Sequence, residues 1–408
     1  MKSVISLSLL FSLFFGFFQQ ATAQKQPPKR LMMHEKDPNA IKDQYMVVFT
    51  KEAFKTIDSQ ANFKNLKSRE AKRKALKQYE AKFKPFAYQT LEQAGISKSK
   101  IVKVFSGKLN GFVIKLTKTE LNLLLKIKRI WWIERDLKFK YTLKPGIIKP
   151  FSTQKVDWGV DKVGSKSGVG KCAFILDTGI DLDHPDLNVS NSLSISYVSA
   201  EPSADDLNGH GTHCAGIIGA KDNLIGTKGV AAGATVVAVK VLGQNGTGTY
   251  SDVSIGVLYS AVVGVPGDVM NLSLSGAGYF FTLDFYLTSF VASSGMYATI
   301  AAGNNDDHAK DYMPARVNGS KIYTISNHDS NDDLTATSNY GNGPVDYAAP
   351  GQSIYSTDIG GTYSTRSGTS MSAPHVAGII LVNNGTIRNR GTVSTDKDTT
   401  KDKMASVN

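Results

Sequence analysis

The sequence predicts an α/β protein with a mostly parallel sheet flanked by helices, preceded by a small α+β domain. Beyond residue 151, short apolar runs alternate with helix-like segments, which is typical of a parallel sheet. Between residues 43 and 139, strand and helix patterns follow in the order β-α-β-β-α-β, the split-βαβ arrangement. A Pro- and Gly-containing stretch from about 141 to 157 separates the two patterns. We therefore expect two globular parts joined by a linker.

The charge divides at nearly the same place. The chain has 408 residues, a length that suggests two or three domains. Its formal charge is +12. Residues 24–150 contain 30 basic and 11 acidic side chains, a net charge of +19, whereas residues 151–408 contain 16 and 24, a net charge of −8. A basic chain often binds nucleic acid. Because the excess belongs to one segment, which lacks an RNA-reading aromatic motif, we expect no nucleic-acid partner.

The first 23 residues have the layout of a secretory signal peptide. Lys2 precedes an apolar run from Val4 to Phe18, and Ala21-Thr22-Ala23 supplies the small-residue cleavage site. The run of about 15 residues is shorter than the roughly 20 that span a bilayer. No other segment is long and apolar enough to cross a membrane. We expect a secreted protein with no membrane partner.

The first part, residues 24–150, consists of a polar leader and a domain with its core at 43–139. Alternating apolar residues predict strands, and a Lys/Ala/Glu-rich stretch predicts a solvent-exposed helix. The expected elements in order are a strand at 43–50, a helix at 59–83, strands at 100–106 and 110–116, a helix at 119–127 and a strand at 131–139.

The second part, residues 151–385, carries the parallel-sheet pattern. Its apolar runs predict buried strands at 172–176, 236–242, 268–274, 297–302 and 322–326. Residues 386–408 are polar, and we expect them to form a poorly ordered tail.

Three segments supply an acid, an imidazole and a hydroxyl, each at the end of an expected element. Asp177 follows a strand in DTGID, His210 opens a helix in GHGTHCAG, and Ser370 opens another in GTSMSAPHVAG. A serine hydroxyl is a weak nucleophile, so a histidine must take its proton, and a carboxylate must orient the imidazole. These residue types indicate nucleophilic acyl transfer.

The three motifs, in the order Asp, His, Ser, resemble those of the subtilisin-like serine proteases, and HGTHCAG most resembles the proteinase K branch. The resemblance implies a subtilisin-like fold in which Asp177 orients His210, His210 is the general base and Ser370 is the nucleophile. It also implies that Asn304, in IAAGN, stabilises the oxyanion together with the Ser370 N–H. No cofactor is required for this chemistry.

Two further segments resemble the substrate-binding strands of that family. One edge contains Gly246, Thr247 and Gly248; the remaining residues implied to bind substrate are Ser273, Leu274, Ser275, Ala302 and Gly303. Such edges pair with an extended peptide through its backbone. Ser275 stands where members of the family often have glycine, which would narrow the entrance to the specificity pocket. The resemblance favours an apolar or aromatic residue before the scissile bond.

The other candidate ligands have structural interpretations. His184 resembles a turn residue of the family and His375 a core residue. His213 lies three residues after His210, a spacing that fits a zinc pair, but no third ligand matches and the resemblance makes it a packed helix residue. Asp346 matches a calcium-binding position of proteinase K-like proteins, so structural calcium is a hypothesis.

We expect Cys172 and Cys214 to be free thiols. Cys172 begins the strand that ends at Asp177, and five residues of strand span roughly 16 Å. Cys214 lies in the His210 helix, at the opposite end of that strand. A disulfide requires Cα atoms within about 7 Å.

Residues 43–139 resemble the inhibitory propeptide of secreted subtilisin-like proteases in YMVVF at 45–49, NGF at 110–112 and WWIERD at 131–136. The resemblance implies a domain that assists folding, inhibits the enzyme and is cleaved off between about 141 and 155. The opposite charges would guide its docking. We expect a monomeric endopeptidase precursor that acts on polypeptides, with a neutral to alkaline optimum. The alternative is a non-catalytic binding protein with this fold.

Overall fold

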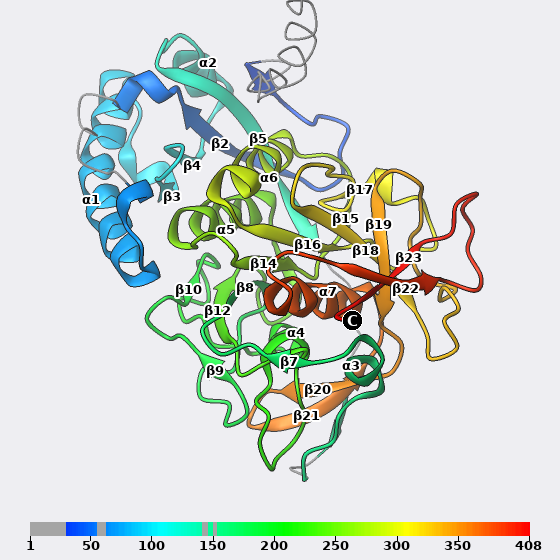
Figure 1. The fold of residues 1–408 in the computed structure, drawn as a ribbon. Coiled ribbons are helices and arrows are strands. Elements are labelled where there is room, and N and C mark those ends of the chain that lie inside the picture. Colours follow the sequence, from blue (N-terminus) through cyan, green and yellow to red (C-terminus); the bar gives the residue numbers. More distant parts are fainter. Residues whose placement is uncertain (1–29, 55–62, 141–145, 150–152) are drawn as a thin grey trace, which may run out of the picture.

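The structure is a computed structural model that describes residues 30–54, 63–140, 146–149 and 153–408 (Figure 1). Strands in a mostly parallel sheet with helices on both sides confirm the α/β class. The predicted signal peptide lies outside the described residues. Within them, no helix is both long and apolar enough to span a bilayer.

The N-terminal unit, as we call the described residues from 30 to 140, contains a sheet with two helices on one face. The strand order is β1-β5-β2-β4-β3, antiparallel except for β1 beside β5. The elements are β1 (Leu31–Met32), β2 (Ala40–Phe49), α1 (Arg69–Gln93), β3 (Ile101–Phe105), β4 (Gly111–Lys115), α2 (Lys118–Leu125) and β5 (Ile130–Lys140). The predicted β-α-β-β-α-β order is present as β2 to β5, and β1 was not predicted.

The predicted bounds of the long helix are wrong: 59–83 was expected and α1 spans 69–93. Ser68 sets the start, because its side chain accepts a hydrogen bond from the backbone N–H of Ala71. Pro85 lies inside the helix. It removes one backbone hydrogen bond, and the burial of Ala87 and Leu91 against the sheet offsets that loss.

The two faces of this sheet bury different partners. Val47 and Phe49 pack in one apolar cluster with side chains of α1 and α2, whereas Met46 and Val48 join the main cluster of the second part. Successive side chains of a strand point to opposite faces of the sheet, so β2 contributes side chains to both apolar clusters. The N-terminal unit is therefore packed against the rest of the chain by one face of its sheet.

The body, as we call residues 153–408, is built on a ten-stranded sheet that is parallel except at β22–β23. This sheet contains β10 (Ile195–Ser196), β12 (Thr235–Lys240), β8 (Cys172–Asp177), β14 (Val269–Leu272), β16 (Tyr297–Ala301), β18 (Ile322–His328), β19 (Val345–Pro350), β23 (Lys403–Ser406) and β22 (Arg388–Thr392) in spatial order, with β9 (Asn188–Val189) beside β12. The five predicted body strands correspond to β8, β12, β14, β16 and β18.

Helices cover both faces of the body sheet (Figure 1). Phe174 and Leu176 of β8 pack in the cluster with α5 (Tyr250–Val263) and α6 (Phe281–Ser294). Ala173 and Ile175 face the opposite way, toward α4 (His210–Gly219), α7 (Thr369–Val382) and α3 (Trp158–Val163). Both faces of β8 are therefore buried, as expected for a central parallel strand.

Short strands complete the body. β7 (Lys166–Ser167) pairs with β11 (Ala231–Ala232), and β15 (Gly276–Ala277) with β17 (Tyr312–Met313). β6 (Ile147–Lys149), β21 (Thr362–Arg366) and β20 (Ile354–Asp358) form an antiparallel sheet. β13 (Thr247–Thr249) pairs with β5 of the N-terminal unit.

The expectation of a poorly ordered tail after residue 385 is wrong. β23 joins the main sheet beside β19 and pairs with β22, and Met404, Ala405 and Val407 are buried. The prediction was based on the polar composition of residues 386–408. The few apolar residues of this segment are concentrated in and beside β23. The body therefore extends to the end of the sequence.

Both cysteines are free, buried thiols, as predicted. Cys172 begins β8, whereas the Cys214 thiol donates a hydrogen bond to the carbonyl of Ser370 at 3.5 Å. Burial raises the pKa of both thiols, so each remains protonated.

Candidate active site

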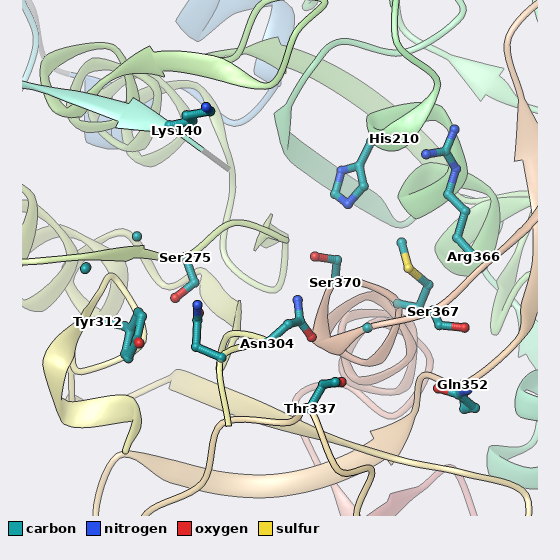
Figure 2. A pocket seen from close by; sticks show the side chains of 15 residues that line it. Lys140, His210, Ser275, Asn304, Tyr312, Thr337, Gln352, Arg366, Ser367 and Ser370 are labelled. Carbon is teal, nitrogen blue, oxygen red and sulfur yellow. The ribbon is translucent and has the colours of Figure 1, made fainter. Parts of the chain in front are cut away.

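Asp177, His210 and Ser370 come together from three elements. Asp177 is the last residue of β8, His210 the first of α4 and Ser370 the second of α7. The Asp177 Oδ1 atom lies 2.8 Å from Nδ1 of His210, and the imidazole faces the Ser370 hydroxyl (Figure 2). A carboxylate only accepts hydrogen bonds, so Nδ1 carries the proton and Nε2 is left as the acceptor. The predicted trio is therefore assembled.

The surrounding backbone fixes the carboxylate and the imidazole. The N–H of Thr178 donates to Oδ1 of Asp177 at 2.7 Å, and the Thr178 hydroxyl accepts from the N–H of Gly211 at 3.0 Å. Asp177 is fully buried and His210 is 4% exposed. This dry environment strengthens the interaction between the two groups.

Asn304 is oriented by the start of α7. Its Oδ1 atom accepts hydrogen bonds from the N–H of Thr369 at 2.8 Å and from the Thr369 hydroxyl at 3.2 Å. The amide nitrogen consequently points toward the Ser370 hydroxyl (Figure 2). The backbone N–H of Ser370 lies in the first turn of α7, where helix N–H groups have no partner within the helix. Two donors thus converge beside Ser370.

A cleft of about 660 Å³ opens over these side chains and holds His210, Ser275, Asn304 and Ser370 in its wall. The Ser370 hydroxyl donates to the carbonyl of Ser273 at 3.0 Å. Ser275 lines the cleft, and its buried hydroxyl has no hydrogen-bond partner among the described residues.

The other predicted substrate residues are not among those that line this cleft. Leu274 and Ala302 are fully buried. Gly303 has φ +110°, and a Cβ there would lie 2.3 Å from Nδ2 of Asn339, so only glycine fits. Gly246 precedes β13, which carries Thr247 and Gly248.

Several cleft residues were not predicted. Lys140 comes from the N-terminal unit, Tyr312 from β17 and Arg366 from β21; Thr337, Gln352, Ser367 and Met371 also line the cleft. Arg366 is buried and paired with Asp358 at 2.9 Å. Most of these cleft residues carry no sequence signal, because segments far apart in the chain bring them together. Ser367 and Met371 are exceptions, since both lie in the motif around Ser370.

His184, His213 and His375 are buried, in keeping with the structural roles expected of them. Nε2 of His213 lies 3.1 Å from the Ile354 carbonyl and 3.2 Å from the Ser364 carbonyl, so Nε2 carries the proton and donates. Burial lowers the pKa of His213 well below its usual value and that of His375 to about 4. His184 bonds to the Thr362 carbonyl.

The described residues contain two groups of three potential metal ligands, and neither includes His213 or Asp346. One is Asp177, His210 and Cys214; the other is Asp396, Asp398 and Asp402. One oxygen of Asp346 accepts from the N–H of Thr324 at 2.9 Å. Burial raises the pKa of Asp346 to about 6.

The last strand of the N-terminal unit enters the cleft along the predicted substrate edge. Lys138, Phe139 and Lys140 of β5 pair antiparallel with Thr249, Gly248 and Thr247 of β13. The buried Phe139 ring lies edge-on to Tyr250 at 5.2 Å. An extended backbone therefore already pairs with the edge expected to bind a peptide.

Two fully buried carboxylates of β5 bind the starts of α5 and α6. Glu134 accepts from the N–H groups of Phe281 and Thr282, each at 2.8 Å. Asp136 accepts from the N–H of Ser251 at 3.1 Å and from its hydroxyl at 2.6 Å. These hydrogen bonds join the two parts, and helix N-termini favour negative charge. At Asp136 burial outweighs this effect and raises the pKa of the carboxyl to about 6.

Cations of the N-terminal unit contact acidic groups of the body. Arg69 is bonded to both carboxylate oxygens of Asp268, at 2.8 and 2.5 Å. Lys103 pairs with Asp252, and Lys72 donates to the carbonyl of Gly264 at 2.5 Å. The opposite charges noted in the sequence meet at this interface.

Residues 173–403, more than half of the chain, match the subtilase family. The chain therefore belongs to the subtilase family of subtilisin-like serine endopeptidases. It is 31% identical to alkaline serine exoprotease A of Vibrio alginolyticus over 388 residues, which cover 91% of this chain and 66% of that protein. It is 40% identical to subtilisin Savinase of Lederbergia lenta over 55% of this chain and 82% of that protein.

Another relative matches a larger share of the chain than Savinase. The alkaline serine protease ver112 of Corniculantispora psalliotae is 35% identical over 68% of this chain and 72% of its own length. Among solved structures, a cold-adapted subtilisin-like serine proteinase aligns with 60% of this chain and 96% of its own, at a TM-score of 0.53 and 32% identity.

Proposed function

We propose that this chain is the precursor of a secreted endopeptidase that hydrolyses peptide bonds through an acyl-enzyme. The geometry of Asp177, His210 and Ser370 carries the proposal, since the three groups meet in a cleft that already pairs with an extended strand. The predicted signal peptide supports secretion, and the family supports polypeptide substrates.

In the first step the Ser370 hydroxyl oxygen attacks the peptide carbonyl carbon while Nε2 of His210 takes its proton. Asp177 keeps the imidazole oriented and stabilises its positive charge. The carbonyl oxygen becomes an oxyanion that accepts from the Asn304 amide and the Ser370 N–H. His210 then protonates the leaving amine as the C–N bond breaks, which leaves an ester on Ser370. Water repeats the sequence and releases the acid.

The N-terminal unit acts as an inhibitor held in place of substrate. Its strand β5 pairs with β13, and Lys140 reaches the cleft wall. Phe139 is 1% exposed against the body, so substrate cannot share this edge. Pairs such as Arg69 with Asp268 add an electrostatic attraction that salt screens.

The same unit assists folding of the body. α6 has Phe280 at its N-cap and no side-chain cap of its own, and Glu134 bonds its first N–H groups. A lost cap typically costs about 1 kcal/mol. The unit thus stabilises α6, whose N-terminus the body leaves without a side-chain cap, whereas Thr249 of the body caps α5.

Self-cleavage separates the two parts between about 141 and 155. Residues 141–145 and 150–152 of this window lie outside the described residues. The described ends support its position: Lys140 lines the cleft, and a Cβ on Gly146 would lie 3.1 Å from Nε of Arg366, another cleft residue.

Calcium fits at Asp346. The carboxylate is half-buried, no ion pair to it occurs among the described residues, and its raised pKa reports an uncompensated charge. Such a carboxylate and neighbouring carbonyl oxygens are ligands that calcium prefers. EDTA should lower the melting temperature, and Asp346→Asn should abolish that shift; equal melting curves with and without EDTA would reject the site.

One experiment tests the nucleophile and the processing together. The secreted product is subjected to N-terminal sequencing and labelled with a fluorophosphonate. We expect an N-terminus between 141 and 155 and label on Ser370. Ser370→Ala should remain full length and unlabelled, whereas Ser192→Ala, at an exposed serine, should behave as the unaltered protein. Normal processing of Ser370→Ala would contradict self-cleavage, and absence of label on the unaltered protein would contradict the acyl-enzyme.

A further inference from the structure

The chain is held on both sides of the cleft. Before it, β5 pairs with β13; after it, Ile147 pairs with Thr365 and the next two residues with Ser364 and Tyr363. β6 thus adds an antiparallel strand to β21, which leads directly to the cleft residues Arg366 and Ser367. The edge that β6 covers is continuous with the path by which a leaving-group segment must exit.

A second hollow of about 640 Å³ adjoins this edge. Val156, Trp158 and Tyr355 form its apolar walls, and Thr365 belongs to both the hollow and the pairing with Ile147; Lys155, Asp157, Asp161 and Ser353 complete the lining. Ser353 follows Gln352, which lines the cleft. The cleft and the hollow are therefore adjacent along β21.

The side chain of Ile147 in β6 does not fill this hollow. Residues directly opposite on antiparallel strands place their side chains on the same face, so the Ile147 side chain lies on the face of Thr365. Yet Ile147 is 70% exposed, and it is not among the residues that line the hollow. An apolar surface of this kind, unfilled by the residue nearest to it, suits a larger side chain of another peptide.

We propose that the edge of β21 and this hollow form a binding site for the leaving-group side of peptide substrates. The substrate adds as a strand in the place of β6, and the hollow takes an apolar side chain. If the scissile bond follows one of residues 141–144, the residue in the place of Ile147 lies about three to six residues past that bond. The inference rests on the proposed peptide hydrolysis. Strand addition supplies affinity through the backbone, and the hollow supplies selectivity.

Cleavage upstream makes the exchange feasible. Before cleavage β6 is tethered at both ends, so a substrate cannot compete with it. Afterwards only three residue pairs hold it to β21, while the chain beyond remains anchored by the bond from the N–H of Gln154 to the Leu224 carbonyl. A short added strand is marginally stable by itself.

The test uses the secreted product of the full chain and two peptides with the same sequence before the scissile bond. One has two residues after it and the other has eight, with phenylalanine scanned through positions three to six. We expect kcat/KM to rise at least tenfold with the long peptide at the best position. Backbone N-methylation of the residues meant to pair with β21 should remove the gain on the unaltered enzyme.

A variant tests the hollow. Val156→Asp should reduce the ratio of long-peptide to short-peptide kcat/KM toward one, while Val169→Asp, at an exposed valine of a different hollow, should keep the ratio. The short peptide reports whether each variant is folded. Equal kcat/KM for both peptides, or a gain insensitive to N-methylation, would overturn this inference and leave the proposed function intact. Hydrolysis of neither peptide would overturn both.

Discussion

Two sets of buried polar groups in this molecule are satisfied in different ways. In the active site the body supplies both partners: Asp177 bonds to His210, and Thr369 holds Asn304. At the starts of α5 and α6 the N-terminal unit supplies one partner, through Asp136 and Glu134. The catalytic set can survive separation of the two parts, whereas the docking set is lost with it. Inhibition and chemistry are therefore separable by substitution.

The largest effect should come from the catalytic set. Asp177→Asn should lower kcat by about 10⁴-fold, because the amide stabilises the wrong imidazole tautomer. Hydrolysis of a short peptide measures it. Docking of the N-terminal unit should be unchanged, since the described hydrogen bonds of the Asp177 side chain are with His210 and Thr178 of the body. A drop in kcat below tenfold would show that Asp177 does not orient His210.

Asn304→Ala should act on the same set with a smaller effect. Loss of one oxyanion donor costs about 10²–10³-fold in kcat, with KM nearly constant, because the bond forms fully only in the transition state. Separate kcat and KM values for the short peptide distinguish this role from substrate binding. A loss confined to KM would assign Asn304 to binding instead.

The docking set should respond to pH through Asp136. Burial raises the pKa of this carboxyl from 3.8 to about 6 in the docked state. A group whose pKa is raised on docking favours docking below its undocked pKa, and this contribution is lost as pH rises through the docked value. Dissociation should therefore increase by about a hundredfold between pH 4 and pH 7, at 1.4 kcal/mol per pKa unit.

Gel filtration of the fluorophosphonate-blocked, processed protein across this pH range checks the prediction. Asp136→Asn should flatten the profile, because the amide does not titrate. Burial also raises the pKa of Asp252, so a residual slope of the same sign is expected. Dissociation that decreases with rising pH would contradict a raised pKa of Asp136 in the docked state.

Glu134→Gln should weaken docking about tenfold, as expected for a lost charged cap on α6. The short-peptide kcat of the released body should stay at the unaltered value, which distinguishes this set from Asp177 and Asn304. Co-elution of the two parts at fixed pH measures the effect. Equal co-elution of Glu134→Gln and the unaltered protein would show that the cap contributes nothing.

The sequence predicted the parts of this comparison that lie in contiguous motifs. Asp177, His210 and Ser370 stand in motifs at strand ends and helix starts, and the resemblance of these motifs to those of subtilisin-like proteases implied their roles and that of Asn304. The capping role of Glu134 left no signal, because the helix that it caps lies 147 residues further along the chain. The same reason hid β6 on β21 and β23 on β19. Non-local pairing depends on partners that composition does not reveal.

Ser275 differs from the other polar groups of the active site because its hydroxyl has no partner in the body. Its substitution has the smallest predicted effect on catalysis. Its buried hydroxyl has no partner among the described residues, and a Cβ on Gly303 would lie 3.1 Å from it across the cleft. Removing the side chain enlarges this passage and removes an unsatisfied polar group. Ser275→Gly should therefore raise the ratio of kcat/KM for phenylalanine over alanine before the scissile bond by several-fold, which corresponds to about 1 kcal/mol, the lower end of the range for small changes in an apolar pocket. Peptides that differ only at this residue measure the ratio. If the ratio falls, the Ser275 hydroxyl contributes to substrate binding and does not narrow the entrance. The partner of this polar group would then come from the substrate, unlike the partners of Asp177 and Asn304, which come from the body.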